Sequence, residues 1–195
     1  MKSKLLLLAA ALPLAGCISF GAKPPPQLLT LTSGFAPQPG ATQDSAKARS
    51  IVVQVPTSPA AIATARVPVW TTPTEVVYVK NAQWSEPPPR LFARLLADAL
   101  TTRANMVVLS SIQSIGDPSA TLAGELRQFG FDATQRQAVV IYDAALTRAG
   151  KQTVEKRRFE ARVPVTAIDA ASAGTGLSQA ANTVAGQVAD WVAQP

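Results

Sequence analysis

The chain has 195 residues, of which 47% are hydrophobic and 15% are charged. This composition is typical of a globular protein and excludes a chain that is disordered throughout. Because it contains no histidine and a single cysteine, histidine-based catalysis, histidine metal sites and a disulfide within the chain are excluded. No nucleophile elbow, P-loop or dinucleotide-binding motif is present. We therefore expect no catalytic residue, no enzymatic activity, no metal and no cofactor.

The N-terminus has the features of a bacterial lipoprotein signal. Two lysines in the first four residues precede an apolar run at 5–15, which is shorter than the roughly 20 residues of a membrane-spanning helix. The run ends in Leu-Ala-Gly-Cys at 14–17, which resembles the lipobox. The sequence therefore predicts a signal peptide over 1–16, cleavage between Gly16 and Cys17, and acylation of Cys17, for example with palmitate.

The segment that follows predicts a tether. Residues 17–49 are rich in proline, with three in succession at 24–26, and such segments are extended and semi-rigid. A short apolar run at 28–31 favours an edge strand that pairs with the domain. Ile18 favours the outer membrane, because aspartate at this position retains lipoproteins at the inner membrane of enteric bacteria. For an exported protein that faces the periplasm we expect no nucleic acid partner, despite the formal net charge of +6.

Residues 50–195 carry the pattern of one domain. β-Branched runs and turn signals predict strands at 50–56, 66–70, 75–80, 106–109, 122–131, 138–146 and 154–165. The second and third of these form a hairpin, and the last three form an antiparallel meander with one face toward the core.

Two helices are predicted from apolar stripes at helical spacing. The first follows the prolines at 87–89, and its stripe consists of Leu91, Phe92, Leu95, Leu96, Ala99 and Leu100. The second follows Gly-Thr-Gly at 174–176, and its stripe consists of Leu177, Ala180, Ala181, Val184, Val188, Trp191 and Val192. The expected fold class is α+β, with mixed α/β layers in which the two amphipathic helices pack on a largely antiparallel sheet.

Several dispersed segments resemble one family. These are TPTEVVY at 72–78, AQWSE at 82–86, GELRQF at 124–129 and VPV at 163–165. Together with the signal they resemble the ABC-type transport auxiliary lipoproteins, the PqiC-like family. The resemblance implies a lipoprotein that docks, as a single copy or as a homo-oligomer, onto an ABC permease complex with an MCE-type substrate-binding protein. Such a complex would move lipids or other apolar compounds across the envelope.

The segment at 69–86 is proline-rich and aromatic between two well-patterned elements, and it is our candidate for partner contacts. The candidate contact residues are Thr72, Tyr78, Gln83, Trp84 and Glu86. Trp84 and Tyr78 are also compatible with the core, and Glu86 with stabilisation of a helix N-terminus. The basic run at 156–158 is interpreted as a solvated strand edge.

Two other functions are compatible with the sequence. One is a structural envelope lipoprotein that links the membrane to another periplasmic assembly. The other is a lipid carrier, which would need a large apolar cavity.

Overall fold

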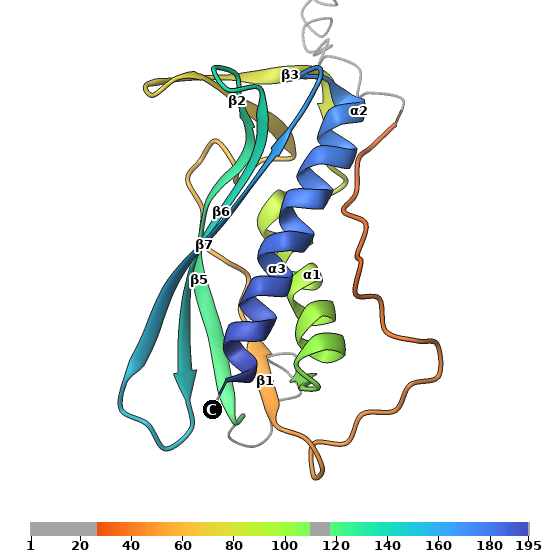
Figure 1. The fold of residues 1–195 in the computed structure, drawn as a ribbon, viewed down its shortest axis with the longest axis vertical. Coiled ribbons are helices and arrows are strands. Elements are labelled where there is room, and N and C mark those ends of the chain that lie inside the picture. The colour runs from red at the N-terminus through yellow and green to blue at the C-terminus, as the bar shows by residue number, and fades with distance from the viewer. Residues whose placement is uncertain (1–26, 110–117, 195) are drawn as a thin grey trace, which may run out of the picture.

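The computed structural model describes residues 27–109 and 118–194 as one sheet with helices on one of its faces (Figure 1). Its strands are β1 (Ser50–Val53), β2 (Arg66–Thr72), β3 (Glu75–Gln83), β4 (Val107–Leu109), β5 (Ala120–Asp132), β6 (Gln137–Arg148) and β7 (Val154–Pro164). The helical layer contains α1 (Pro88–Arg103), α2 (Ala170–Ser172), a π-helical segment η1 (Ala173–Leu177) and α3 (Ser178–Ala193). The α+β fold class is confirmed, while Cys17 and the predicted cleavage site lie outside the described residues.

The sheet is built around β5. Along one side β5 pairs with β6 in antiparallel orientation, and β6 pairs in turn with β7, so the predicted meander is confirmed. Along its other side β5 pairs in parallel with β1 near its start and with β2 near its end. The predicted hairpin of β2 and β3 is also confirmed.

The two faces of the meander differ as the alternating sequence predicts. On β7, Phe159 and Ala161 are buried, while Arg158, Glu160 and Arg162 are exposed. The buried side chains face α3, which packs against β6 and β7. The opposite face carries no helix (Figure 1), and its strands therefore present polar side chains to solvent.

The predicted stripes of both helices are buried. All six stripe residues of α1 and all seven of the final helix lie in the core. Two prolines at the N-terminus of α1 are tolerated because backbone donors there lack an intrahelical partner. The helices pack on each other, and Phe92 of α1 meets Tyr142 of the sheet edge-on at 5.3 Å between ring centroids. A fully buried leucine or phenylalanine contributes about 1.5–3 kcal/mol to such a core.

The final helical segment begins earlier than predicted. Helical structure starts at α2, where the side chain of Asp169 accepts a hydrogen bond from the Ser172 amide at 2.8 Å, and the glycines at 174–176 lie inside η1. A Cβ on Gly176 would lie 3.0 Å from Val165 and 3.1 Å from Ala138. The glycine therefore lets the helical layer approach the sheet closely at this point.

The apolar run at 28–31 forms a single bridge and not a strand. The Leu29 amide donates to the Gln83 carbonyl at 2.8 Å, and the Ser85 amide donates to the Leu29 carbonyl at 2.7 Å. From there the chain passes along α1 and α3 and reaches β1 at the opposite end of the domain (Figure 1). We call residues 27–49 the strap. The first part of the strap, at 29–35, is docked on the helical layer.

Candidate functional site

The β2–β3 hairpin extends across one end of the domain (Figure 1) and carries three of the predicted contact residues. Thr72 is exposed at the turn, where its hydroxyl lies 3.4 Å from that of Thr74. Tyr78 is half-buried, with the Arg66 guanidinium stacked 3.5 Å from its ring centroid. Gln83 is half-buried at the end of β3, where its carbonyl binds the strap. The structure thus keeps these three residues along one surface strand or its turn.

Trp84 and Glu86 have other partners. The Trp84 side chain is only 1% exposed and meets Phe129 edge-on at 5.6 Å between ring centroids, so it belongs to the core in this conformation. Glu86 accepts two hydrogen bonds from Arg94, at 2.7 and 3.1 Å. These bonds lower the pKa of the Glu86 carboxyl. Glu86 precedes the N-cap residue of α1, so its main contact is this ion pair and not the first turn of the helix.

The hairpin presents apolar surface to solvent. Val76 is 36% exposed and Val77 is 49% exposed, and Trp70, which pairs with Val76 across the strands, is half-buried. Exposed valines beside aromatic rings and a stacked arginine are features of protein interfaces, where aromatic residues and arginine are enriched. The hairpin is therefore the candidate docking surface.

The hairpin is held close to the rest of the sheet at Gly130. A Cβ at this position would lie 2.3 Å from the Pro68 carbonyl and 2.8 Å from the Trp70 ring. Only glycine therefore permits the observed approach of β2 to β5. This contact holds the middle of β2 against β5, while the turn beyond it is exposed.

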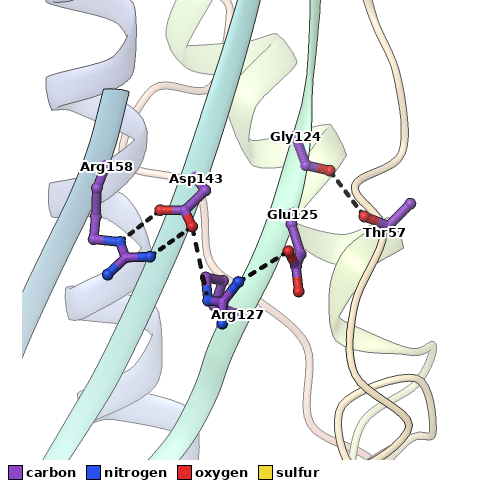
Figure 2. A network of polar contacts seen from close by, with 6 residues as sticks. All are labelled: Thr57, Gly124, Glu125, Arg127, Asp143 and Arg158. Atoms are coloured by element: carbon purple, nitrogen blue, oxygen red, sulfur yellow. Dashed lines mark hydrogen bonds and ion pairs between the residues drawn. The ribbon is translucent and has the colours of Figure 1, made fainter. Parts of the chain in front are cut away.

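A second polar feature lies on the helix-free face of the meander, and Figure 2 shows it in close-up. Arg158 donates two hydrogen bonds to Asp143, at 2.6 and 2.7 Å. Arg127 lies 3.7 Å from the same carboxylate and donates to Glu125 at 3.1 Å. The bonds from Arg158, with a smaller contribution from the charge of Arg127, lower the pKa of Asp143. We call these four residues the ion-pair cluster.

The ion-pair cluster borders a hollow of about 520 Å³. Charged side chains line much of it, including Lys156, Arg157 and Arg158 of β7. Such a lining offers no support for an apolar lipid cavity at this position. At the other margin, the Thr57 amide and hydroxyl donate to the Gly124 carbonyl at 3.0 and 3.3 Å (Figure 2).

The partner of Arg158 was not predictable from the local sequence. The basic run at 156–158 is exposed on β7, in agreement with the solvated edge that we predicted. Asp143, however, is 15 residues away, and only the register of β6 and β7 places it opposite Arg158. The only signal in the sequence was the alternation of polar and apolar residues, which places both Asp143 and Arg158 on the outward faces of neighbouring strands.

Within residues 27–109 and 118–194, no group of three or more cysteine, aspartate or glutamate side chains could hold a metal ion. In the same described residues, none of the helices combines the length and the hydropathy needed to cross a membrane.

Comparison with known proteins identifies the family. A family model described as the ABC-type transport auxiliary lipoprotein component matches residues 30–189. The chain belongs to this family. Among curated proteins no sequence match is significant. The match of this auxiliary lipoprotein to its family begins inside the strap, so the strap shares the family pattern with the sheet and the helices.

Solved structures share the fold of the auxiliary lipoprotein. A crystal structure of a Xanthomonas campestris protein assigned to DUF330 is 23% identical, with a TM-score of 0.71. The match covers 85% of this chain and 94% of that chain. A crystal structure of an uncharacterized protein is 19% identical, with a TM-score of 0.64, and the match covers 74% of this chain and 92% of that chain. The family places the protein in the cell envelope as an auxiliary component of ABC-type transport.

Proposed function

We propose that the protein is anchored in the outer membrane through acylated Cys17, faces the periplasm and acts by docking, without catalysis. Its partner is an MCE-type substrate-binding protein that works with an ABC permease to move lipids or other apolar compounds. Family membership supports the transport role, and the lipobox at 14–17 supports the anchor. The membrane contact is thus made by the N-terminal lipid and the protein contact by the folded domain.

The observation that carries the docking role is the exposed hairpin. Thr72 lies free of the helical layer at its turn, and the neighbouring Val76 and Val77 are exposed on β3. We assign the partner contact to this strand, with Tyr78 and Gln83 at its half-buried positions. Confinement to a membrane raises the effective concentration of such a surface, so modest contacts are sufficient for binding.

A photocrosslinking side chain tests this assignment in intact envelopes. Placed at Thr72, it should capture the MCE-type protein or a second copy of this chain. The matched control is Thr147, an exposed threonine on β6, where we expect no capture. The adducts are identified by mass spectrometry of the crosslinked bands.

Two results would contradict the proposal at different levels. Capture from Thr147 but not from Thr72 would show that the docking face is wrong. If the complex purified from envelopes contains no transport protein, the docking function itself fails, and a structural lipoprotein that links the membrane to another assembly becomes the better explanation. A Cys17→Ser variant, which cannot be acylated, should lose most of the capture at Thr72.

A further inference from the structure

We infer that the strap orients the domain on its membrane, so that the β2–β3 hairpin lies at the membrane-proximal end and meets a protein partner beside the lipid headgroups. The inference rests on the proposed acylation of Cys17. It goes beyond the docking role because residues 27–49 now orient the domain, with the hairpin end toward the membrane.

Hydrogen bonds from both helices hold the strap. The Asn182 side chain of α3 accepts from the Gly34 amide at 2.7 Å and donates to the Thr32 carbonyl at 2.8 Å. On α1, the Thr102 hydroxyl donates to the Phe35 carbonyl at 2.6 Å. The two helices thus bind backbone groups within residues 32–35, which fixes the path of the strap over both of them.

Packing reinforces these bonds. The Phe35 ring lies against Gly186 of α3, where an added Cβ would be 3.3 Å from the ring. Leu29 and Leu31 are half-buried against the core. At the far end of the strap, Arg49 donates to the Ala193 carbonyl at 3.1 Å. The strap is therefore held at residues 29–35 and again at Arg49, while residues 36–47 between these contacts are exposed.

The docked strap decides where the membrane link leaves the domain. The link between Cys17 and Gln27 is ten residues long, and a fully extended chain of this length spans at most about 36 Å. It leaves the domain beside Leu29, which bridges to Trp84 directly after β3. The end that carries the hairpin is thus kept within about 36 Å of the anchor.

An undocked strap would remove this constraint. The link would then run from Cys17 to Ser50, and its maximum span would be about 120 Å. It would also join the domain where β1 begins, at the opposite end from β3 (Figure 1). The turn between β6 and β7 lies at that opposite end, about 40 Å away along the 12 residues of β6. Docking therefore selects which end faces the membrane.

The selected end carries the candidate docking surface. A partner that binds the hairpin must reach it between the domain and the headgroups. The occupant is therefore a partner protein whose binding surface lies at the membrane. A partner that projects far from the membrane would meet the β6–β7 turn instead.

Energy transfer to labelled lipids tests the orientation. Because Cys17 carries the lipid and is the sole cysteine, one introduced cysteine can be labelled uniquely in the full acylated protein. We place a donor dye at Thr72→Cys, in the turn of the hairpin, or at Gln152→Cys, in the exposed turn between β6 and β7. The protein is then bound to vesicles that contain acceptor-labelled phosphatidylethanolamine. Transfer from position 72 should exceed transfer from position 152.

Strap release supplies the decisive comparison. Asn182→Ala combined with Thr102→Val removes the hydrogen bonds from both helices to the strap. The transfer efficiency from position 72 divided by that from position 152 should then fall to one or below. Phe35→Ala loosens the strap without changing either helix, so it guards against a folding defect. Thr183→Ala is the matched control, since its hydroxyl bonds within α3 to Gln179 and the ratio should stay at the wild-type value.

The outcomes separate this inference from the proposed function. Equal transfer from positions 72 and 152 in vesicle-bound wild type overturns the orientation, as does a ratio that is unchanged in all release variants. Failure of the acylated protein to float with vesicles contradicts the anchor. If a crosslinker at Thr72 captures no partner while transfer from position 72 still exceeds transfer from position 152, the docking partner is contradicted and the orientation is supported.

Discussion

Asp143 shows how single residues tie the meander together. Its carboxylate accepts two hydrogen bonds from Arg158 on β7 and lies 3.7 Å from Arg127 on β5. The pKa of this carboxyl is thereby lowered below its ordinary value of 3.8. A group whose pKa is lower in the folded state contributes stability above its unfolded pKa and loses it as the pH falls through the folded value.

We expect Asp143→Asn to flatten the acid dependence of stability. The variant should be less stable than wild type near neutral pH, and the two free energies of unfolding should converge as the pH falls below about 3.8. Arg158→Gln removes the same pair from the other side and should flatten the curve similarly. Urea unfolding between about pH 2 and pH 6 measures this. A difference between variant and wild type that is constant with pH would contradict the assigned pair.

At the scale of elements, the contact of β2 with β5 depends on Gly130. A Cβ there would lie 2.3 Å from the Pro68 carbonyl, a distance that only a backbone shift can relieve. We expect Gly130→Ala to destabilise the protein by about 1–3 kcal/mol, the usual cost of overpacking. Gly174→Ala is the control, because its Cβ would meet Leu29 at an ordinary 3.6 Å. Thermal unfolding compares the two variants, and equal midpoints would contradict a steric role for Gly130.

Much of the element pattern was predictable from sequence, since alternation and helical stripes report burial directly. Phe159 and Ala161 on β7 and the buried stripe of α1 are found where the pattern placed them. The parallel pairing of β1 and β2 with β5 was not predictable, because pairing depends on contacts between residues more than 60 positions apart. The start of the last helical segment was missed because glycine usually ends a helix, whereas Gly176 here packs inside one.

The strap was interpreted as tether because its composition is that of a spacer. Its docking depends on Phe35, which lies outside the apolar run at 28–31, and on Asn182, a polar residue near the apolar stripe of α3. Each residue alone is unremarkable in sequence. The hydrogen bond from the Gly34 amide to Asn182, over 148 positions, is visible only in the folded chain. Sequence therefore indicated Thr72, Tyr78 and Gln83 as surface candidates but gave no sign of the segment that orients them.

For the whole molecule, we expect two levels of stability. β6 is paired on both sides along its length, and β5 pairs with β6 throughout and with β1 and β2 at its two ends. The strap, by contrast, is held by a few exposed hydrogen bonds. Hydrogen exchange should therefore be slowest in β5 and β6 and much faster in the strap, by local opening. Asn182→Ala should accelerate exchange at Gly34 without changing β5. Uniform acceleration would show that the strap and the sheet open together.

The contact between Gly34 and Asn182 also orders events in an exported chain. Secretion delivers the N-terminus first, and the α3 surface at Gly186 against which Phe35 packs does not exist until α3 has crossed the membrane and folded. During that interval the segment around Cys17, where we propose cleavage and acylation, would be joined to an unfolded chain. The proposed maturation of the anchor would then precede closure of the strap, and the finished domain would capture a segment that has already been processed.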